Sequence, residues 1–167
     1  MRAVILAAGQ GTRLRPLTNH IPKCLIAVNE TSILEHQLRA LVRVGVSHAI
    51  VVTGFQGDLI EQKFGPHVAG IDMVYVRNPR FRDTNNLYSL WSARTQLNDD
   101  VLLIEGDVLF EHLLLEDLLN NPHSDAAVVD TYGQGMDGTV IFEEGDIARS
   151  MVLKSRQRQN FDYRDAL

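Results

Sequence analysis

Cysteine and tryptophan are scarce in this chain, and long apolar runs are missing. The single cysteine, Cys24, excludes a disulfide within the chain and suits a reducing compartment. No stretch is long and apolar enough to predict a membrane-spanning helix. The sequence begins directly with a strand-like segment, so we expect no signal peptide and a cytoplasmic location.

An excess of basic residues is also missing. The 167 residues include 16 Lys and Arg against 21 Asp and Glu, a formal net charge of −5, which argues against a nucleic-acid partner. The charge is uneven, because the first 30 residues carry one acidic side chain, Glu30, and four basic ones: Arg2, Arg13, Arg15 and Lys23. We therefore expect a positive field near the N-terminus that suits an anionic small substrate.

Strand and helix patterns alternate along the chain, which predicts βαβ units. Strands are predicted at residues 2–7, 48–53, 72–76, 101–105, 125–132, 139–143 and 148–154, with a glycine-rich turn at 133–138. Helices are predicted at 33–44 (N-cap Ser32, ended by Gly45), from an Asp58 cap to 64, from a Thr84 or Asn85 cap to 97, and at 113–120. This order favours an α/β fold with three αβα layers and a mostly parallel, Rossmann-like sheet, in one domain over residues 1–167.

The loop after the first strand has the character of a phosphate-binding loop. Gly9 and Gly11 allow a sharp turn and let backbone N–H groups approach a phosphate, while Arg13 and Lys23 add positive charge. Arginine offers a planar fork and lysine a point charge, so the two side chains suit different phosphates of one triphosphate. A Rossmann fingerprint is excluded because Leu14 stands where a third glycine is needed, and the P-loop tripeptide is absent.

Carboxylates follow the predicted strand at residues 101–105. In parallel α/β sheets the ligand lies at the carboxyl ends of the strands, so the segments after each strand should converge there. Strand alternation predicts that Glu105 and Asp107 point the same way. Because Mg²⁺ prefers carboxylate oxygens and lets substrate phosphates complete its shell, Asp107 is a candidate metal ligand.

A run of polar residues, from Thr84 through Asn85 and Asn86 to Ser89, lies at the start of a predicted helix. Its amides both donate and accept hydrogen bonds, as reading the edge of a pyrimidine base requires. The alternative is that this run caps the helix and does nothing more. Gln56, after the second buried strand, is a further candidate near the base.

These motifs resemble the nucleotidyltransferases that activate phosphorylated sugars and alcohols. Their Ala-Ala-Gly-x-Gly-x-Arg-Leu loop and following Pro-Lys match residues 7–14 and 22–23. The Asn-Asn-x-Tyr-Ser-Leu run at 85–90 resembles bacterial CTP:phosphocholine and 2-aminoethylphosphonate cytidylyltransferases. The resemblance implies Mg²⁺ held by Asp107, Arg13 and Lys23 as catalytic residues, and CTP bound by Ala7, Ala8, Gly9, Gln10, Gly11, Thr12, Gln56, Thr84, Asn85, Asn86 and Ser89.

The same resemblance leaves several points open. Members of the family run on for some tens of residues, so we expect the domain to be incomplete at its C-terminus. Either the chain is a fragment, or the missing part comes from another chain, in an oligomer or from a fusion partner. The implied acceptor is a small phosphorylated or phosphonate alcohol or amine. Phosphocholine would need an aromatic cage, and Trp91 is expected in the core instead. The alternatives are a non-catalytic nucleotide-binding module and a sugar-1-phosphate nucleotidyltransferase.

Overall fold

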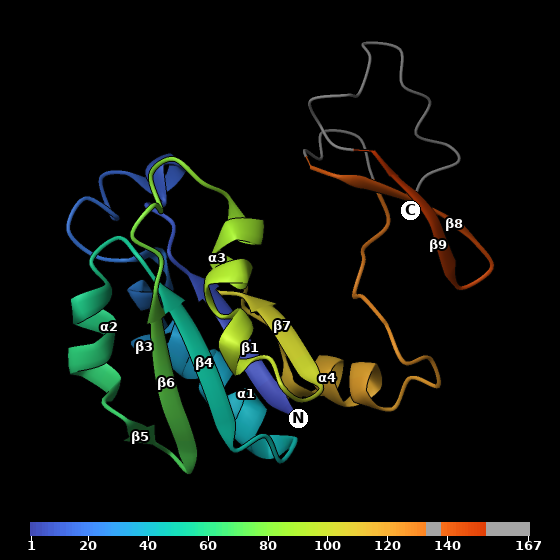
Figure 1. Ribbon diagram of the computed structural model, residues 1–167, viewed down its shortest axis with the longest axis horizontal. Coiled ribbons are helices and arrows are strands. Elements are labelled where there is room, and N and C mark those ends of the chain that lie inside the picture. Colours follow the sequence, from blue (N-terminus) through green and yellow to red (C-terminus); the bar gives the residue numbers. More distant parts are fainter. Residues whose placement is uncertain (133–137, 153–167) are drawn as a thin grey trace. The chain divides into compact units, whose positions relative to one another are not determined.

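The computed structural model describes residues 1–132 and 138–152. Two compact units divide the chain, one from Met1 to Asn120 and one beginning at Asn121. The first unit holds a five-stranded sheet and all the helices of the described residues, and the second holds a two-stranded hairpin (Figure 1).

The sheet of the first unit has the order β5-β6-β4-β1-β7. Its four main strands run parallel: β1 (Arg2–Ala7), β4 (His48–Thr53), β6 (Ile71–Arg77) and β7 (Val101–Glu105). The short β5 (His67–Val68) pairs with β6 in the antiparallel sense. The predicted mostly parallel sheet is confirmed. Because β1 lies between β4 and β7, the loop after Ala7 begins between the ends of these two strands.

Helices cover both faces of this sheet because its strands are apolar on both faces. Ala3, Ile5 and Ala7 of β1 pack on one face with α1 (Ile33–Arg43), α2 (Gly57–Phe64) and α4 (His112–Leu119). Val4 and Leu6 pack on the other face, under α3 (Asn86–Ser92) and η3 (Arg94–Gln96). Figure 1 looks onto this second face, with α3 in front of the sheet. The three predicted layers are therefore present.

The connection from β1 to α1 is long and contains only short elements. It passes through η1 (Thr12–Leu14), η2 (Lys23–Leu25) and the small hairpin of β2 (Ala27–Val28) and β3 (Thr31–Ser32). This segment carries most of the residues that the sequence assigns to phosphate binding, and α1 packs against η2 beneath it.

Three predicted helix ends differ from the structure. Ser32 holds the predicted N-cap position of α1, but its side chain makes no capping hydrogen bond, and its Oγ accepts from Lys63 Nζ at 3.2 Å. Asp58 lies inside the first turn of α2, where its carboxylate pairs with Arg77, and Gln56 in a left-handed conformation (φ 49°) is the residue before that helix. The helix predicted to run to residue 97 ends at Ser92 and continues as the 3₁₀ turn η3. By contrast, Gly45 ends α1 as predicted, with φ 79°.

The strand predicted at residues 125–132 is wrong. The segment is in no strand, and its valines Val128 and Val129 are about half exposed (52% and 46%), which is unlike the buried strands of the first unit. The last two predicted strands are confirmed as the antiparallel hairpin of β8 (Val140–Glu144) and β9 (Ile147–Val152). The glycine-rich turn at 133–137 and residues 153–154 lie outside the described residues.

Candidate active site

A hollow of about 270 Å³ lies at the carboxyl ends of β1 and β7. It is lined by thirteen residues from four parts of the chain: Leu6, Ala7, Gly9, Gly11, Thr12, Arg13, Leu14, Lys23, Cys24, Asn86, Glu105, Gly106 and Asp107. Eight of the sequence-predicted site residues are among them. A larger hollow of about 490 Å³ lies at the amino ends of the strands, but ligands of parallel α/β sheets bind at the carboxyl ends, so the smaller hollow is the candidate site.

Residues 7–14, here called the phosphate loop, turn at Gly11. This glycine has φ 61°, and a Cβ on it would lie 3.0 Å from Cγ2 of Thr18, so the turn itself requires glycine. The buried Thr18 holds the loop from outside, because its hydroxyl donates to the Gly11 carbonyl at 2.8 Å. A Cβ on Gly9 would meet nothing within 4 Å, so packing does not explain that glycine.

Two glycines let the neighbouring strands close around the end of β1. A Cβ on Gly106 would lie 2.6 Å from the Leu6 carbonyl oxygen, and one on Gly54 would lie 2.6 Å from that of Ala8. The Gly106 N–H donates to Leu6 O at 2.9 Å, which continues the sheet to the point where the carboxylates begin. A side chain at either position would push the ends of β4 and β7 away from the phosphate loop.

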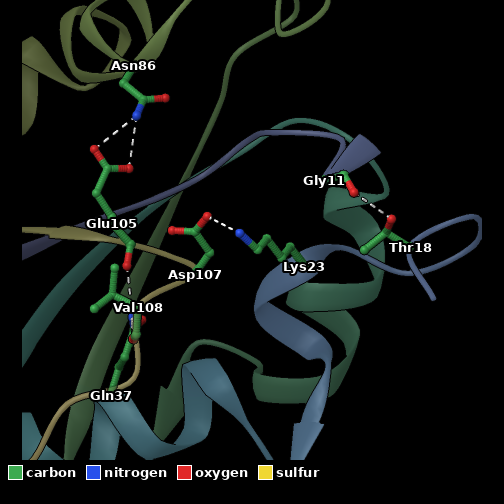
Figure 2. Close-up of polar contacts among 8 residues, drawn as sticks. All are labelled: Gly11, Thr18, Lys23, Gln37, Asn86, Glu105, Asp107 and Val108. Atoms are coloured by element: carbon green, nitrogen blue, oxygen red, sulfur yellow. Dashed lines mark hydrogen bonds and ion pairs between the residues drawn. The ribbon is translucent and has the colours of Figure 1, made fainter. Parts of the chain in front are cut away.

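Opposite charges meet on the floor of the hollow. The Lys23 ammonium, at the start of η2, forms an ion pair with the Asp107 carboxylate (Figure 2). Arg13 lines the same hollow, and among the described residues its guanidinium has no ion-pair partner. The predicted phosphate-binding cations and the predicted metal ligand are thus brought together, although 84 residues separate Lys23 from Asp107.

Glu105 is a second carboxylate of the hollow, beside Asp107. Both of its oxygens accept hydrogen bonds from the Asn86 amide nitrogen, each at 2.9 Å, across the gap between β7 and α3 (Figure 2). Partial burial raises the pKa of Glu105 above its ordinary value, while the Asn86 hydrogen bond lowers it and the Asp107 charge raises it. The two carboxylates line one hollow, as predicted, but each has a different partner.

A buried glutamine holds the turn that carries both carboxylates, residues 105–108, here called the acidic turn. Nε2 of Gln37, on α1, donates to the carbonyl oxygens of Glu105 at 2.9 Å and Val108 at 2.7 Å (Figure 2). Gln37 is 1% exposed. The sequence prediction missed this residue, although a polar side chain on the otherwise apolar face with Leu34 and Leu41 was a usable signal.

The remaining predicted residues lie away from the hollow. Residues 84–89, here called the asparagine segment, are held mainly by each other and by the buried Asn78: its amide nitrogen contacts Thr84 Oγ1 at 3.2 Å and Ser89 Oγ at 3.1 Å. Asn85 caps α3, accepting from the Tyr88 N–H at 3.3 Å. The residues predicted to bind nucleotide that do not line the hollow are Ala8, Gln10, Gln56, Thr84, Asn85 and Ser89. Their assignment stays a prediction.

Cysteine and tryptophan each occur once in the chain, and the structure shows the surroundings of both side chains. Cys24 is 2% exposed, and burial raises the pKa of its thiol to about 12, so it is a neutral buried side chain rather than a thiolate nucleophile. The core position predicted for Trp91 is wrong. Its side chain is 52% exposed, and the Arg94 guanidinium lies 3.7 Å from the ring centroid.

The carboxylates of the hollow suit a Mg²⁺ ion whose other ligands are phosphate oxygens of a bound nucleotide. Within residues 1–132 and 138–152, no group of three or more His, Cys, Asp or Glu side chains could hold a metal ion by itself. Magnesium sites that use substrate phosphates need only one or two carboxylates, and Asp107 and Glu105 supply these beside the phosphate loop. In the same part of the chain, no helix has the length and apolar character that crossing a membrane requires.

The fold is shared with nucleotidyltransferases of known structure. Residues 3–161 match the family model of the MobA-like NTP transferase domain, and the chain belongs to this family. The resemblance to nucleotidyltransferases that the loop predicted is confirmed.

Individual relatives are named for different nucleotides. A CMP-5'-(3-aminopropyl)phosphonate synthase of Streptomyces rubellomurinus is 38% identical over 168 residues, which is all of this chain and 27% of that protein. A UTP–glucose-1-phosphate uridylyltransferase of Haloferax volcanii is 34% identical over 76% of this chain and 51% of that protein. The solved CTP:phosphocholine cytidylyltransferase of Streptococcus pneumoniae has a TM-score of 0.62 and 26% identity, over 92% of this chain and 64% of that one. This chain spans between a quarter and a half of the length of the curated relatives it matches first.

Proposed function

We propose that the protein is a Mg²⁺-dependent cytidylyltransferase, which transfers CMP from CTP to a small phosphorylated or phosphonate alcohol or amine and releases pyrophosphate. The observation that carries this proposal is the convergence of the phosphate loop, Lys23 and the acidic turn on one hollow at the carboxyl ends of the sheet. Family membership supports the reaction type, and the relatives named for CMP or CTP support the nucleotide.

In this proposal the chain acts by positioning and by neutralising charge. Backbone N–H groups of the phosphate loop would bind the triphosphate, with Lys23 at the α-phosphate and Arg13 at the β- and γ-phosphates. A phosphate or phosphonate oxygen of the acceptor would attack the α-phosphate in line and expel pyrophosphate. No protein base is needed, because the attacking oxygen is already an anion.

Asp107 would hold Mg²⁺. When bound, the ion would offset negative charge on the triphosphate. The Lys23–Asp107 ion pair fits this arrangement, since the triphosphate would become the partner of Lys23 and leave the Asp107 carboxylate to the metal. Glu105 is engaged by Asn86, which leaves Asp107 as the better candidate of the two carboxylates.

Two other functions have specific support. The 34% identity to a uridylyltransferase acting on glucose 1-phosphate favours a sugar-1-phosphate nucleotidyltransferase as the second candidate. The partial coverage of the relatives, 27% and 52% of their lengths, keeps a non-catalytic nucleotide-binding module as the other candidate. We also propose that residues 1–167 belong to one nucleotidyltransferase domain. A cytoplasmic location is proposed as well, because the single buried cysteine suits a reducing compartment.

Pyrophosphate release separates these functions. The purified protein is incubated with each of the four ribonucleoside triphosphates and with phosphocholine, 2-aminoethylphosphonate or glucose 1-phosphate, with Mg²⁺ and with EDTA. We expect release with CTP and a phosphocholine- or phosphonate-type acceptor, and none with EDTA. Release from UTP and glucose 1-phosphate would establish the second candidate, and nucleotide binding without release would establish the binding module.

A further inference from the structure

We propose that Glu105 is a positioning residue that sets the base preference of the site by fixing the orientation of the Asn86 amide. The inference rests on the proposed function, because it assigns a role in choosing the nucleotide. Both residues line the hollow, and they are joined by the paired 2.9 Å contacts between one amide nitrogen and two carboxylate oxygens.

The chemistry of the pair allows one orientation of the amide. An ionised carboxylate only accepts hydrogen bonds, and the asparagine amide has one end that donates and one that accepts. Turning the Asn86 amide over would place its oxygen against the Glu105 carboxylate. Its Nδ2 therefore faces Glu105, and its Oδ1 lies on the side away from Glu105 (Figure 2). No hydrogen bond among the described residues ends on Oδ1.

Both partners are held in place by their backbones. The Glu105 carbonyl accepts from Gln37, and the next residue, Gly106, donates to β1, so the end of β7 is fixed on two sides. Asn86 is the first residue of α3, whose start is capped by Asn85. Gln37 and Asn85, which hold these two backbones, do not line the hollow themselves, so they leave its space to a ligand.

An acceptor of fixed direction on a residue that lines the hollow would distinguish the two pyrimidines. Cytosine carries an amino group at C4, which donates, and uracil carries an oxygen there, which accepts. The Asn86 Oδ1 would pair with the cytosine amine and oppose the uracil oxygen. In Glu105→Gln the carboxylate becomes an amide that can itself donate, so the Asn86 amide can turn over and present its NH₂ group to uracil.

The test is a double-mutant cycle on the ratio of the UTP and CTP dissociation constants. Competition binding is measured with the purified wild type, Glu105→Gln, Asn86→Ala and the double variant, with thermal melting to verify folding. We expect Glu105→Gln to reduce the UTP-to-CTP ratio of Kd values about fivefold or more. In the Asn86→Ala background the same change should have no further effect on the ratio. Glu111→Gln, an exposed glutamate outside the hollow, is the matched control and should leave the ratio unchanged.

The outcomes distinguish failure of this inference from failure of the proposed function on which it rests. If the wild type prefers CTP and a folded Glu105→Gln variant keeps the same ratio, the inference is overturned. It is also overturned if Glu105→Gln changes the UTP-to-CTP ratio of Kd values by the same factor in the Asn86→Ala background as in the wild type. A wild type that prefers UTP or a purine overturns the cytidylyltransferase proposal itself. Should Glu105→Gln fail to fold, Glu105→Ala removes the same acceptor and is read in the same way.

Discussion

The phosphate loop and the asparagine segment lie on two sides of the hollow, and they differ in how many of their residues line it. On one side, Gly9, Gly11, Thr12 and Arg13 of the phosphate loop all line the hollow. On the other side, the asparagine segment contributes Asn86 alone. Asn85 caps α3, while Thr84 and Ser89 accept hydrogen bonds from the buried Asn78. Residues that stand together in a sequence motif thus have separate tasks, some holding the backbone and some facing the ligand.

The difference follows from the kind of backbone on each side. The phosphate loop has little regular structure beyond the single turn η1, and a left-handed glycine and one threonine hydrogen bond help to fix its shape. The asparagine segment begins a short helix, whose first N–H groups need acceptors. Asn85 supplies one of them and is therefore occupied. The comparison predicts which substitutions change function and which change stability.

The largest effect is expected for Lys23→Ala. The ammonium lies where charge on the α-phosphate would grow in the transition state, and loss of one such contact costs about 3–4 kcal/mol. We expect turnover to fall more than about a hundredfold while the melting temperature stays close to that of the wild type. Steady-state kinetics and thermal melting check both parts, and wild-type turnover would remove Lys23 from the catalytic assignment.

Asp107→Asn tests the acidic side of the same ion pair. The amide keeps the shape of the side chain and removes the charge that Mg²⁺ requires, so Mg²⁺-dependent CTP binding should be lost. Stability should change little, because the Lys23 and Asp107 side chains are 27% and 39% exposed and such pairs contribute about 0–1 kcal/mol. Calorimetry with CTP, with and without Mg²⁺, measures this. Equal Mg²⁺–CTP affinity in the variant and the wild type would show that Asp107 holds no metal.

Within the phosphate loop, the two glycines should respond in opposite ways. Gly11→Ala forces a side chain into a left-handed backbone and against Thr18, so it should destabilise the fold by about 1–2 kcal/mol. Gly9→Ala meets no neighbour, so stability should hold while the methyl group reduces the space for a phosphate and weakens CTP binding several-fold. Denaturant unfolding and CTP titration of both variants test the contrast. Equal behaviour of the two would contradict it.

Within the asparagine segment, the two neighbouring asparagines should also separate. Asn85→Ala removes the cap of α3 and should cost about 0.5–2 kcal/mol of stability. Asn86→Ala should leave stability nearly unchanged and weaken CTP more than UTP. Unfolding by denaturant and competition binding of both nucleotides decide between the roles. If Asn85→Ala selectively lost CTP binding, Asn85 would also take part in recognising the base, which would contradict the separation of the two asparagines.

The sequence predicted the sheet because its strands are continuous apolar runs, and β4 and β7 have the predicted boundaries. It failed at residues 125–132, where Val128 and Val129 match a strand pattern but no partner buries them. Caps were harder to predict than strands. Ser32 has the predicted N-cap position but makes no capping hydrogen bond, and Asp58 lies inside the first turn of α2. Their side chains contact Lys63 and Arg77, which are distant in sequence.

At the site, the sequence was enough to select residues whose side-chain chemistry alone suggests a role, such as Lys23 and Asp107. It could not predict that they pair, since that contact joins residues 84 positions apart. It likewise gave Asn85 and Asn86 the same role, because both are amides in one motif. Their difference arises from geometry, as one lies at the cap position and the other faces Glu105.

The most direct test of this division of tasks is a crystal structure of the protein with a non-hydrolysable CTP analogue and Mg²⁺. We predict phosphates against the phosphate loop and Lys23, and the cytosine amine within hydrogen-bonding distance of Asn86 Oδ1. Asn85 should still cap α3, and Glu105 should still bind Asn86. A triphosphate bound outside the hollow, or a base held by Asn85 while Asn86 makes no contact with it, would contradict the account.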